Sequence, residues 1–107
     1  MEADYLLHVA IPLDLESAKT TGFYSTSSLD SEGFIHCCLP AQLDGVLERY
    51  FVTIENYLIV EIDLAELPEN LQPVYENTMG GEELFPHIYG RIPFVAMKII
   101  DKKDNQS

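Results

Sequence analysis

The sequence has few basic residues, and this scarcity limits the partners that the protein can bind. Only six lysines and arginines stand against 18 aspartates and glutamates, so the 107-residue chain has a formal net charge of -12. Such a charge repels nucleic-acid phosphates and anionic lipid headgroups at long range. We therefore expect no nucleic-acid partner and no membrane partner. We interpret the acidic surface as a solvated one that keeps the protein soluble.

Cysteines and long apolar runs are also scarce. The two cysteines, Cys37 and Cys38, are adjacent, and neighbours on opposite faces of a strand do not readily form a disulfide. The longest apolar runs, residues 57–60 and 92–97, are far shorter than the roughly 20 residues of a membrane span. Residues 1–4 are acidic rather than basic, which is not typical of a secretory signal. We expect a single cytoplasmic domain, with its core over residues 4–101 and a frayed tail over residues 102–107.

Alternation and periodicity of apolar residues predict an α+β fold. The expected strands cover residues 4–10, 33–38, 57–64 and 94–100, with a short extended piece over 72–76. The expected helices cover residues 15–20, between Asp14 as N-cap and Gly22, and a stretch that begins at Pro40. Loops or turns are expected over residues 23–32, 65–70 and 77–83. The nearly all-apolar strand over 57–64 is expected to be central in curved, largely antiparallel sheets with two main helices.

The three histidines all lie in apolar, strand-like segments. His8, His36 and His87 each have apolar neighbours on both sides. A single histidine in such a setting is more often a core residue hydrogen-bonded to backbone than a functional group. Because all three follow the pattern, a shared site is the other interpretation. The segment Phe85–Gly90 is likewise either a rigid bend that holds a side chain or an ordinary turn that packs on the core.

Several kinds of chemistry lack a motif in this sequence. There is no CxxC, HxxxH or HExxH pattern, and adjacent cysteines on a strand cannot both face one ion, so we expect no metal. A nucleophilic Cys37 or Cys38 with a histidine base is a weaker interpretation than a small buried side chain. No GxGxxG or P-loop pattern is present, so a nucleotide would need another mode of binding.

Four segments together resemble a known family. They are the first strand with its histidine (Tyr5–His8), GFIHC at Gly33–Cys37, the glutamine that follows (Gln42), and FPHIYG at Phe85–Gly90. In this order, over roughly residues 5–100, the chain resembles the bacterial Domain of Unknown Function family nine-five-two. The resemblance implies an ADP-ribosyltransferase-like fold, with small split sheets around a cleft for a nicotinamide dinucleotide. Arg91 stands where the family often has proline, and this cation favours a phosphate-bearing ligand.

The family has no assigned biochemical role, so the function is a hypothesis based on the implied fold and on the three histidines. The leading hypothesis is that the cleft binds a small molecule such as NAD or an ADP-ribose-like ligand and catalyses ribosyl transfer or hydrolysis. The candidate catalytic residues are His36, His87 and Glu76, and the candidate cofactor-binding residues are His8, Tyr24, Ser28, Gln42, Tyr89 and Arg91. In this hypothesis His8 and Arg91 hold ribose or phosphate, His36 orients the ribose, and His87 or Glu76 polarises the acceptor.

Two alternatives remain open at this point. The first is a binding module on the same fold that has lost turnover, which would fit the lack of an obvious acid near the cleft. The second is a structural or interaction protein whose histidines are core residues. The binding module predicts ligand binding without a product. The structural alternative differs from both other hypotheses in that the three histidines need not converge on one solvent-connected pocket.

Overall fold

Small antiparallel sheets form the framework of the molecule. The computed structural model describes residues 4–77 and 83–104. The first sheet has the strand order β1–β4–β8 and consists of β1 (Tyr5–Ala10), β4 (Asn56–Asp63) and β8 (Met97–Asp104). The second pairs β2 (Phe23–Tyr24) with β7 (Ile92–Pro93), and the third has the order β3–β6–β5, from β3 (Ile35–His36), β6 (Phe85–Ile88) and β5 (Val74–Glu76). Every pairing among these strands is antiparallel. The predicted α+β class with largely antiparallel sheets is confirmed, and β4 is central as expected.

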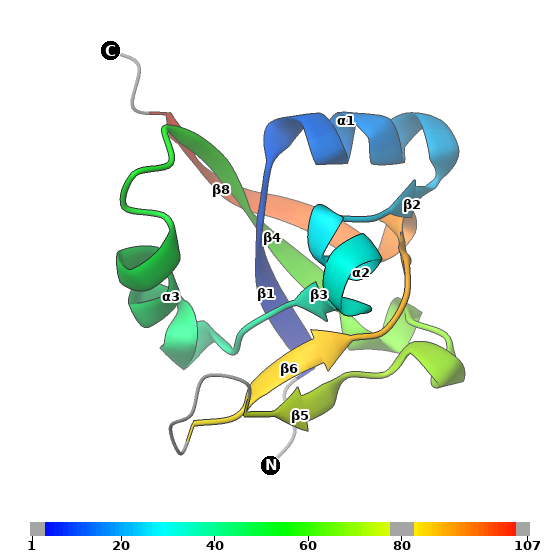
Figure 1. Cartoon of the computed structure of the whole chain (residues 1–107). Helices are drawn as coiled ribbons and strands as arrows, with labels where there is room; N and C mark the ends of the chain where they lie inside the picture. The colour runs from blue at the N-terminus through cyan, green and yellow to red at the C-terminus, as the bar shows by residue number, and fades with distance from the viewer. Residues whose placement is uncertain (1–3, 78–82, 105–107) are drawn as a thin grey trace.

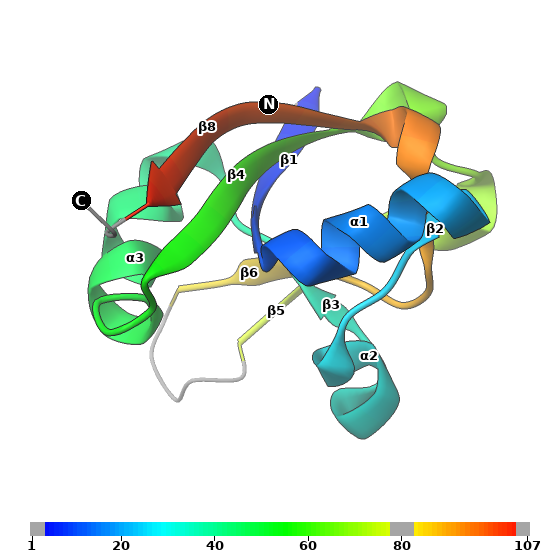
Figure 2. The ribbon, with the colours of Figure 1, turned by 90° about the horizontal axis from the view of Figure 1, so that it is seen from above.

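Helices and short 3-10 turns connect the strands. The α-helices of the described residues are α1 (Pro12–Thr21), α2 (Ser27–Glu32) and α3 (Leu43–Tyr50). The 3-10 turns are η1 (Pro40–Gln42), η2 (Leu64–Glu66), η3 (Glu69–Leu71) and η4 (Phe94–Ala96). Figures 1 and 2 show α1 and α3 on different sides of β1. None of the described helices is long and apolar enough to cross a membrane.

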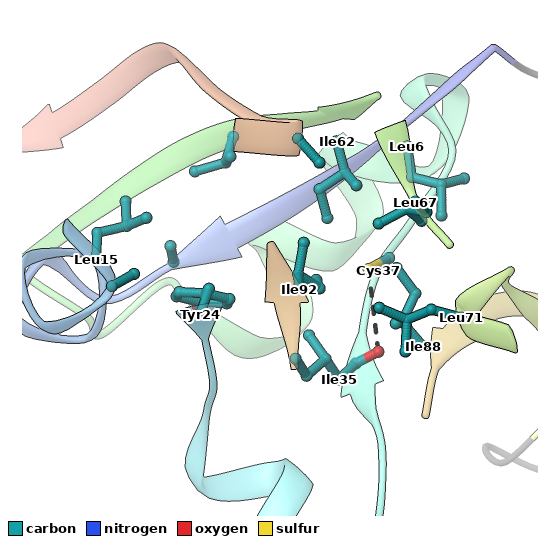
Figure 3. Close-up of a cluster of buried hydrophobic side chains, with 14 residues drawn as sticks. Leu6, Leu15, Tyr24, Ile35, Cys37, Ile62, Leu67, Leu71, Ile88 and Ile92 are labelled. Atoms are coloured by element: carbon teal, nitrogen blue, oxygen red, sulfur yellow. Dashed lines mark hydrogen bonds between the residues drawn. The ribbon is translucent and has the colours of Figure 1, made fainter. Parts of the chain in front are cut away.

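The alternation of side chains along β1 divides the apolar residues between two cores. Leu6 and Ala10 point into the main core, which also holds Leu15 of α1 (Figure 3). Val9 points to the other face and packs with residues of β4 and α3. The main core is completed by Ala18, Tyr24, Ile35, Cys37, Val60, Ile62, Leu67, Leu71, Ile88, Ile92 and Ala96. Because neighbouring residues of a strand face opposite ways, one short strand supports both layers.

The first half of the chain departs from the predicted boundaries in two places. Helix α1 begins at Pro12, with Ile11 rather than Asp14 as its N-cap, because proline is well suited to the first turn. The segment 23–32, expected to be a loop, contains β2 and α2, so the structure has a third helix beside the two expected. In α2 the Thr26 hydroxyl accepts a hydrogen bond from the backbone N–H of Leu29, and Gly33, with φ 90°, ends the helix.

The predicted strands at the centre and end of the chain also need correction. The strand expected over 33–38 is reduced to Ile35–His36, and beyond it only isolated bonds continue, such as the bridge between Leu7 and Cys38. Residues 94–96 form η4 rather than strand, and β8 continues to Asp104 in register with β4. Residues 102–104 are therefore not a frayed tail. Most of the loop predicted over 77–83 lies outside the described residues.

Replacing a core isoleucine tests the assignment of the main core. Ile88 of β6 is 0% exposed, whereas Ile99 of β8 is 48% exposed. We expect Ile88→Ala to lower the free energy of unfolding by about 3 kcal/mol, because it removes buried methyl groups and leaves a cavity. The matched change Ile99→Ala is expected to cost less than about 1 kcal/mol. Urea denaturation of the two variants measures both values, and equal losses would contradict this account of the core.

Candidate functional site

A partly open cavity of about 410 Å³ lies beside β1. Its volume is within the range of roughly 300–1,000 Å³ that is usual for small-molecule sites. Residues from β1, α1, β2, α2, β3, α3 and β6 contribute to the walls. The lining residues are Leu7, His8, Val9, Ile11, Asp14, Tyr24, Thr26, Ser27, Ser28, Glu32, His36, Cys37, Cys38, Val46, Tyr50, Phe51, Phe85 and His87. All three histidines of the chain therefore line one cavity.

The His8 imidazole is held by two hydrogen bonds and connects three sheets. Its Nδ1 lies 2.5 Å from the main-chain oxygen of His36, and its Nε2 lies 2.6 Å from the Tyr24 hydroxyl. Because a carbonyl oxygen can only accept, Nδ1 carries the proton and the Tyr24 hydroxyl donates to Nε2. Burial lowers the pKa of His8 to about 4, so the ring is neutral near pH 7. Both nitrogens are occupied, and His8 therefore positions its neighbours.

His36 forms a pair with Glu32 at the cavity wall. Its Nε2 lies 2.6 Å from Oε2 of Glu32, and both side chains are 49% exposed. The carboxylate accepts from Nε2–H, so Nδ1 of a neutral His36 bears the lone pair. The two residues lie four apart but on different elements, because α2 ends at Gly33 before β3 begins. The short helix α2 thus places a carboxylate against the histidine of the next strand.

His87 forms a second histidine–carboxylate pair, in a more buried setting. The residue is 1% exposed, and its Nδ1 lies 2.9 Å from Oε1 of Glu76. Tyr89 donates a short hydrogen bond to the same oxygen. The hydrogen bonds from Tyr89 and His87 lower the pKa of Glu76, and the bond to Glu76 raises the pKa of Tyr89. Because Nδ1–H donates to the carboxylate, Nε2 of a neutral His87 can accept a proton.

Phe34 brings the two histidine–carboxylate pairs together. Its ring stacks on His87 with centroids 4.1 Å apart, and it lies 4.8 Å from the His36 ring in an edge contact. The rings of His36 and His87 are themselves 5.2 Å apart between centroids. Antiparallel pairing produces this proximity, because His36 and His87 are opposite each other in the β3–β6 ladder.

The backbone of β1 leaves a free edge in the cavity. Leu7 exchanges two 2.8 Å hydrogen bonds with Cys38, which occupies the edge of β1 at that point. Residues two apart on a strand direct their N–H and C=O to the same side, so Val9 directs both groups the way Leu7 does, away from β4. Val9 lines the cavity. Among the described residues no backbone hydrogen bond joins the N–H or C=O of Val9 to a partner on that side.

Asp14 is the other acidic residue of the lining. Burial raises the pKa of its carboxyl, and this carboxylate in turn contributes to the raised pKa of Tyr24, whose main cause is burial. The Asp14 carboxylate makes no hydrogen bond or ion pair with any residue that the structure describes. No lysine or arginine is among the described lining residues. The cavity is therefore apolar with a negative bias.

The buried cysteines do not have the properties of a nucleophile. Both are free, and both line the cavity. Burial raises the pKa of Cys38 to about 11 and also raises that of Cys37. The thiol form is therefore favoured at neutral pH, whereas a nucleophilic cysteine needs its thiolate. Among residues 4–77 and 83–104, no group of three or more His, Cys, Asp or Glu is arranged to hold a metal ion.

Five of the nine predicted site residues line the cavity, namely His8, Tyr24, Ser28, His36 and His87. Glu76 and Tyr89 lie behind His87 rather than in the lining. Gln42 instead joins chain segments, because it accepts from the Leu39 N–H at 2.9 Å and donates to the Leu84 carbonyl at 2.8 Å. Arg91 lies over the Phe23 ring, 5.5 Å from its centroid.

Asp14, Glu32, Phe34 and Val9 are not among the residues that the sequence pattern indicates as a site. Among 18 acidic residues no single pair stands out, and the pattern around Asp14 indicates a helix cap. Glu32 could have been found from its place four residues before His36, had the helix α2 been predicted. Val9 contributes its backbone, which a sequence pattern does not reveal.

The fold and the site define a small α+β protein with a histidine-lined cavity. The chain belongs to the family described as "Protein of unknown function (DUF952)", whose profile matches residues 11–99. The family resemblance noted from the motifs is thereby confirmed. No curated protein matches the chain.

Two solved structures share the fold. The crystal structure of protein CC0527 from Caulobacter crescentus has a TM-score of 0.73 and 22% sequence identity, over 94% of this chain and 84% of that one. A double methionine variant of the same protein gives a TM-score of 0.72 at 22% identity, with the same coverage of both chains. At this identity the likeness concerns the fold.

The buried His8 makes stability depend on pH. Because the folded pKa of about 4 lies below the ordinary 6.5, the unfolded chain binds the proton more readily between these values. Stability is therefore lost as the pH falls from about 6.5 through 4. We expect His8 to contribute a loss of about 3 kcal/mol in the free energy of unfolding between pH 7 and pH 4.

The variant His8→Gln serves as the comparison, because it cannot titrate in this range. Glu76, with its lowered pKa, acts in the same direction as His8, and Asp14, with its raised pKa, acts in the opposite one. Subtracting the pH profile of the variant from that of the wild type isolates the histidine. Urea denaturation from pH 4 to pH 7 gives the free energy of unfolding of both proteins. If the two pH profiles run parallel, His8 is not buried and neutral.

Proposed function

We propose that the cavity binds the nicotinamide–ribose part of NAD or of a related nucleotide and that the protein transfers or hydrolyses the ribosyl bond. The observation that carries this proposal is the convergence of His8, His36 and His87 on one cavity. Carboxylate-paired histidines in a concave, mostly apolar site are typical of sites that carry out proton transfer. The choice of ligand comes from the ADP-ribosyltransferase-like fold that the family resemblance implies.

The free edge at Val9 supports a ligand with a carboxamide. A primary amide presents one N–H donor and one C=O acceptor, as the edge of a neighbouring strand does. It can therefore pair with the C=O and N–H of Val9. The aromatic lining residues Tyr50 and Phe51 offer a surface for the attached ring. A pyridine carboxamide such as nicotinamide meets both requirements.

The two histidine–carboxylate pairs support chemistry at the ribosyl bond. In hydrolysis, the bond between the ribose C1′ and the ring nitrogen breaks, and its electron pair leaves with nicotinamide. A water oxygen bonds to C1′, and its proton passes to Nε2 of His87, which Glu76 holds in the accepting tautomer. The charge of Glu32, next to His36, stabilises the cationic ribosyl group that develops in between.

The charges of the site restrict how a dinucleotide can lie. Because the described lining contains Asp14 and Glu32 but no lysine or arginine, the pyrophosphate is expected to remain outside the cavity. His8 has no free nitrogen for a phosphate, and Arg91 lies on Phe23. These contacts support a role for His8 in positioning Tyr24 and the His36 backbone rather than in holding a phosphate. The binding-module alternative depended on a cleft without an acid, and Glu32 removes that argument.

Incubation with NAD tests the enzymatic proposal. We expect the wild-type protein to release nicotinamide, measured by chromatography, and His87→Gln to slow the release by about 10²-fold or more, as is usual when a proton-transfer group is lost. Glu32→Gln should slow it as well, because the neutral amide does not stabilise positive charge. A thermal shift with NAD but no product would favour the binding module, and neither shift nor product would refute the proposal.

An acidic residue away from the cavity provides the control. Glu66 of η2 is exposed and is not part of the lining, so Glu66→Gln makes the same chemical change as Glu32→Gln. We expect its rate to equal that of the wild type. Equal losses in the two variants would indicate a general effect of charge on this acidic protein.

Competition between two small ligands tests the contact with Val9. Nicotinamide has a carboxamide, whereas nicotinate has a carboxylate that cannot donate to the Val9 carbonyl and meets the negative lining. We expect nicotinamide to compete with NAD at least about 10-fold better, since a lost hydrogen bond at a buried acceptor costs roughly 1–3 kcal/mol. Equal competition, measured by displacement in NMR, would exclude this mode of binding.

A further inference from the structure

We infer that the cavity selects ligands whose bound ring carries a positive charge and that Asp14 determines this selection. The inference rests on the proposed function, because it names the substrate class of the same site. It uses three observations that the proposal does not need: an unpaired carboxylate, the absence of cations from the described lining, and a set of aromatic rings. Each is a property of the cavity without a ligand.

The Asp14 carboxylate is placed as the partner of a cation. It lies in the first turn of α1 and lines the cavity beside Ile11. Partial burial raises the pKa of this carboxyl, which means that the charged form has lost part of its hydration without gaining a compensating partner. By contrast, Glu32 has His36 and Glu76 has His87 as partners. A bound cation would supply what Asp14 lacks and would lower its pKa again.

Aromatic rings provide the other half of such a site. Tyr24, Tyr50, Phe51 and Phe85 all line the cavity. The face of an aromatic ring attracts cations through its quadrupole, and the attraction strengthens where water is excluded. A pyridinium or another flat organic cation can contact these rings while its charge lies near Asp14. A neutral ring of the same shape gains the apolar contacts but leaves the carboxylate unpaired.

The selection has a consequence for turnover. When the ribosyl bond breaks, its electron pair neutralises the ring, so the product loses the charge that held the substrate at Asp14. The site then binds the neutral ring less tightly than the cationic one. The Asp14 carboxylate would thus favour both the binding of the cationic substrate and the release of the neutral product.

Two isosteric probes test the inference. The cation is 1-methylnicotinamide, and its neutral counterpart is 3-methylbenzamide, in which carbon replaces the charged ring nitrogen. We expect wild-type protein to bind the cation at least about 10-fold more tightly, as measured by chemical-shift titration. Asp14→Asn should abolish the preference, because it weakens the binding of the cation and leaves the binding of the neutral probe unchanged. Glu16→Gln, on the exposed side of the same helix, should leave the preference intact.

The outcomes separate this inference from the proposed function. Equal affinities in the wild type, a preference that persists in Asp14→Asn, or no binding of the cation would each overturn the selection by Asp14. Nicotinamide release from NAD is measured independently, so cleavage without charge preference would refute only the inference. Charge preference without cleavage would refute only the enzymatic proposal. Titration of the Asp14 carboxyl gives a further readout, because the bound cation should lower its pKa.

Discussion

The two hydrogen bonds of the His8 ring are the interaction on which the site depends. They join β1 to Tyr24 of β2 and to the backbone of His36 in β3, and these strands belong to three different sheets. The sheets are small, and two-residue strands such as β2 and β3 have little stability of their own. A single neutral imidazole therefore fixes the relative positions of three walls of the cavity. An ionised ring could not accept from Tyr24, so the geometry requires the low pKa that burial produces.

The larger elements could be predicted because their signals are local and repeated. The apolar residues of β4 alternate several times, and the helical spacing of α3 repeats over two turns. Both elements occur, although the first turn predicted for the helix, at Pro40–Gln42, is the 3-10 turn η1. Helix α2 was missed because its six residues include no buried side chain and hence no periodic pattern. Thr26 at its start and Gly33 at its end were visible in the sequence, but hydroxyl and glycine residues are equally typical of loops.

The candidate site was predictable only as far as its histidines. Their apolar surroundings set them apart, and strand pairing brings His36 opposite His87. Asp14 and Glu32 could not be separated from the other acidic residues in the sequence. Asp14 differs from them by its partial burial without a partner, and Glu32 differs by its pairing with His36. Gln42 and Arg91 were selected on the family motifs, yet their contacts are with the Leu39 and Leu84 backbone and with Phe23. Such contacts depend on tertiary structure.

The free edge at Val9 also bears on self-association. Unpaired strand edges are sites at which another chain can add, and proteins commonly protect them with charges, bulges or covering segments. Here the Leu7–Cys38 bridge occupies the edge on one side, and Val9 itself is only 9% exposed. The backbone groups of Val9 are too few for an added strand, which needs several consecutive pairs. The recessed position of this edge beside Cys38 thus disfavours aggregation through β1.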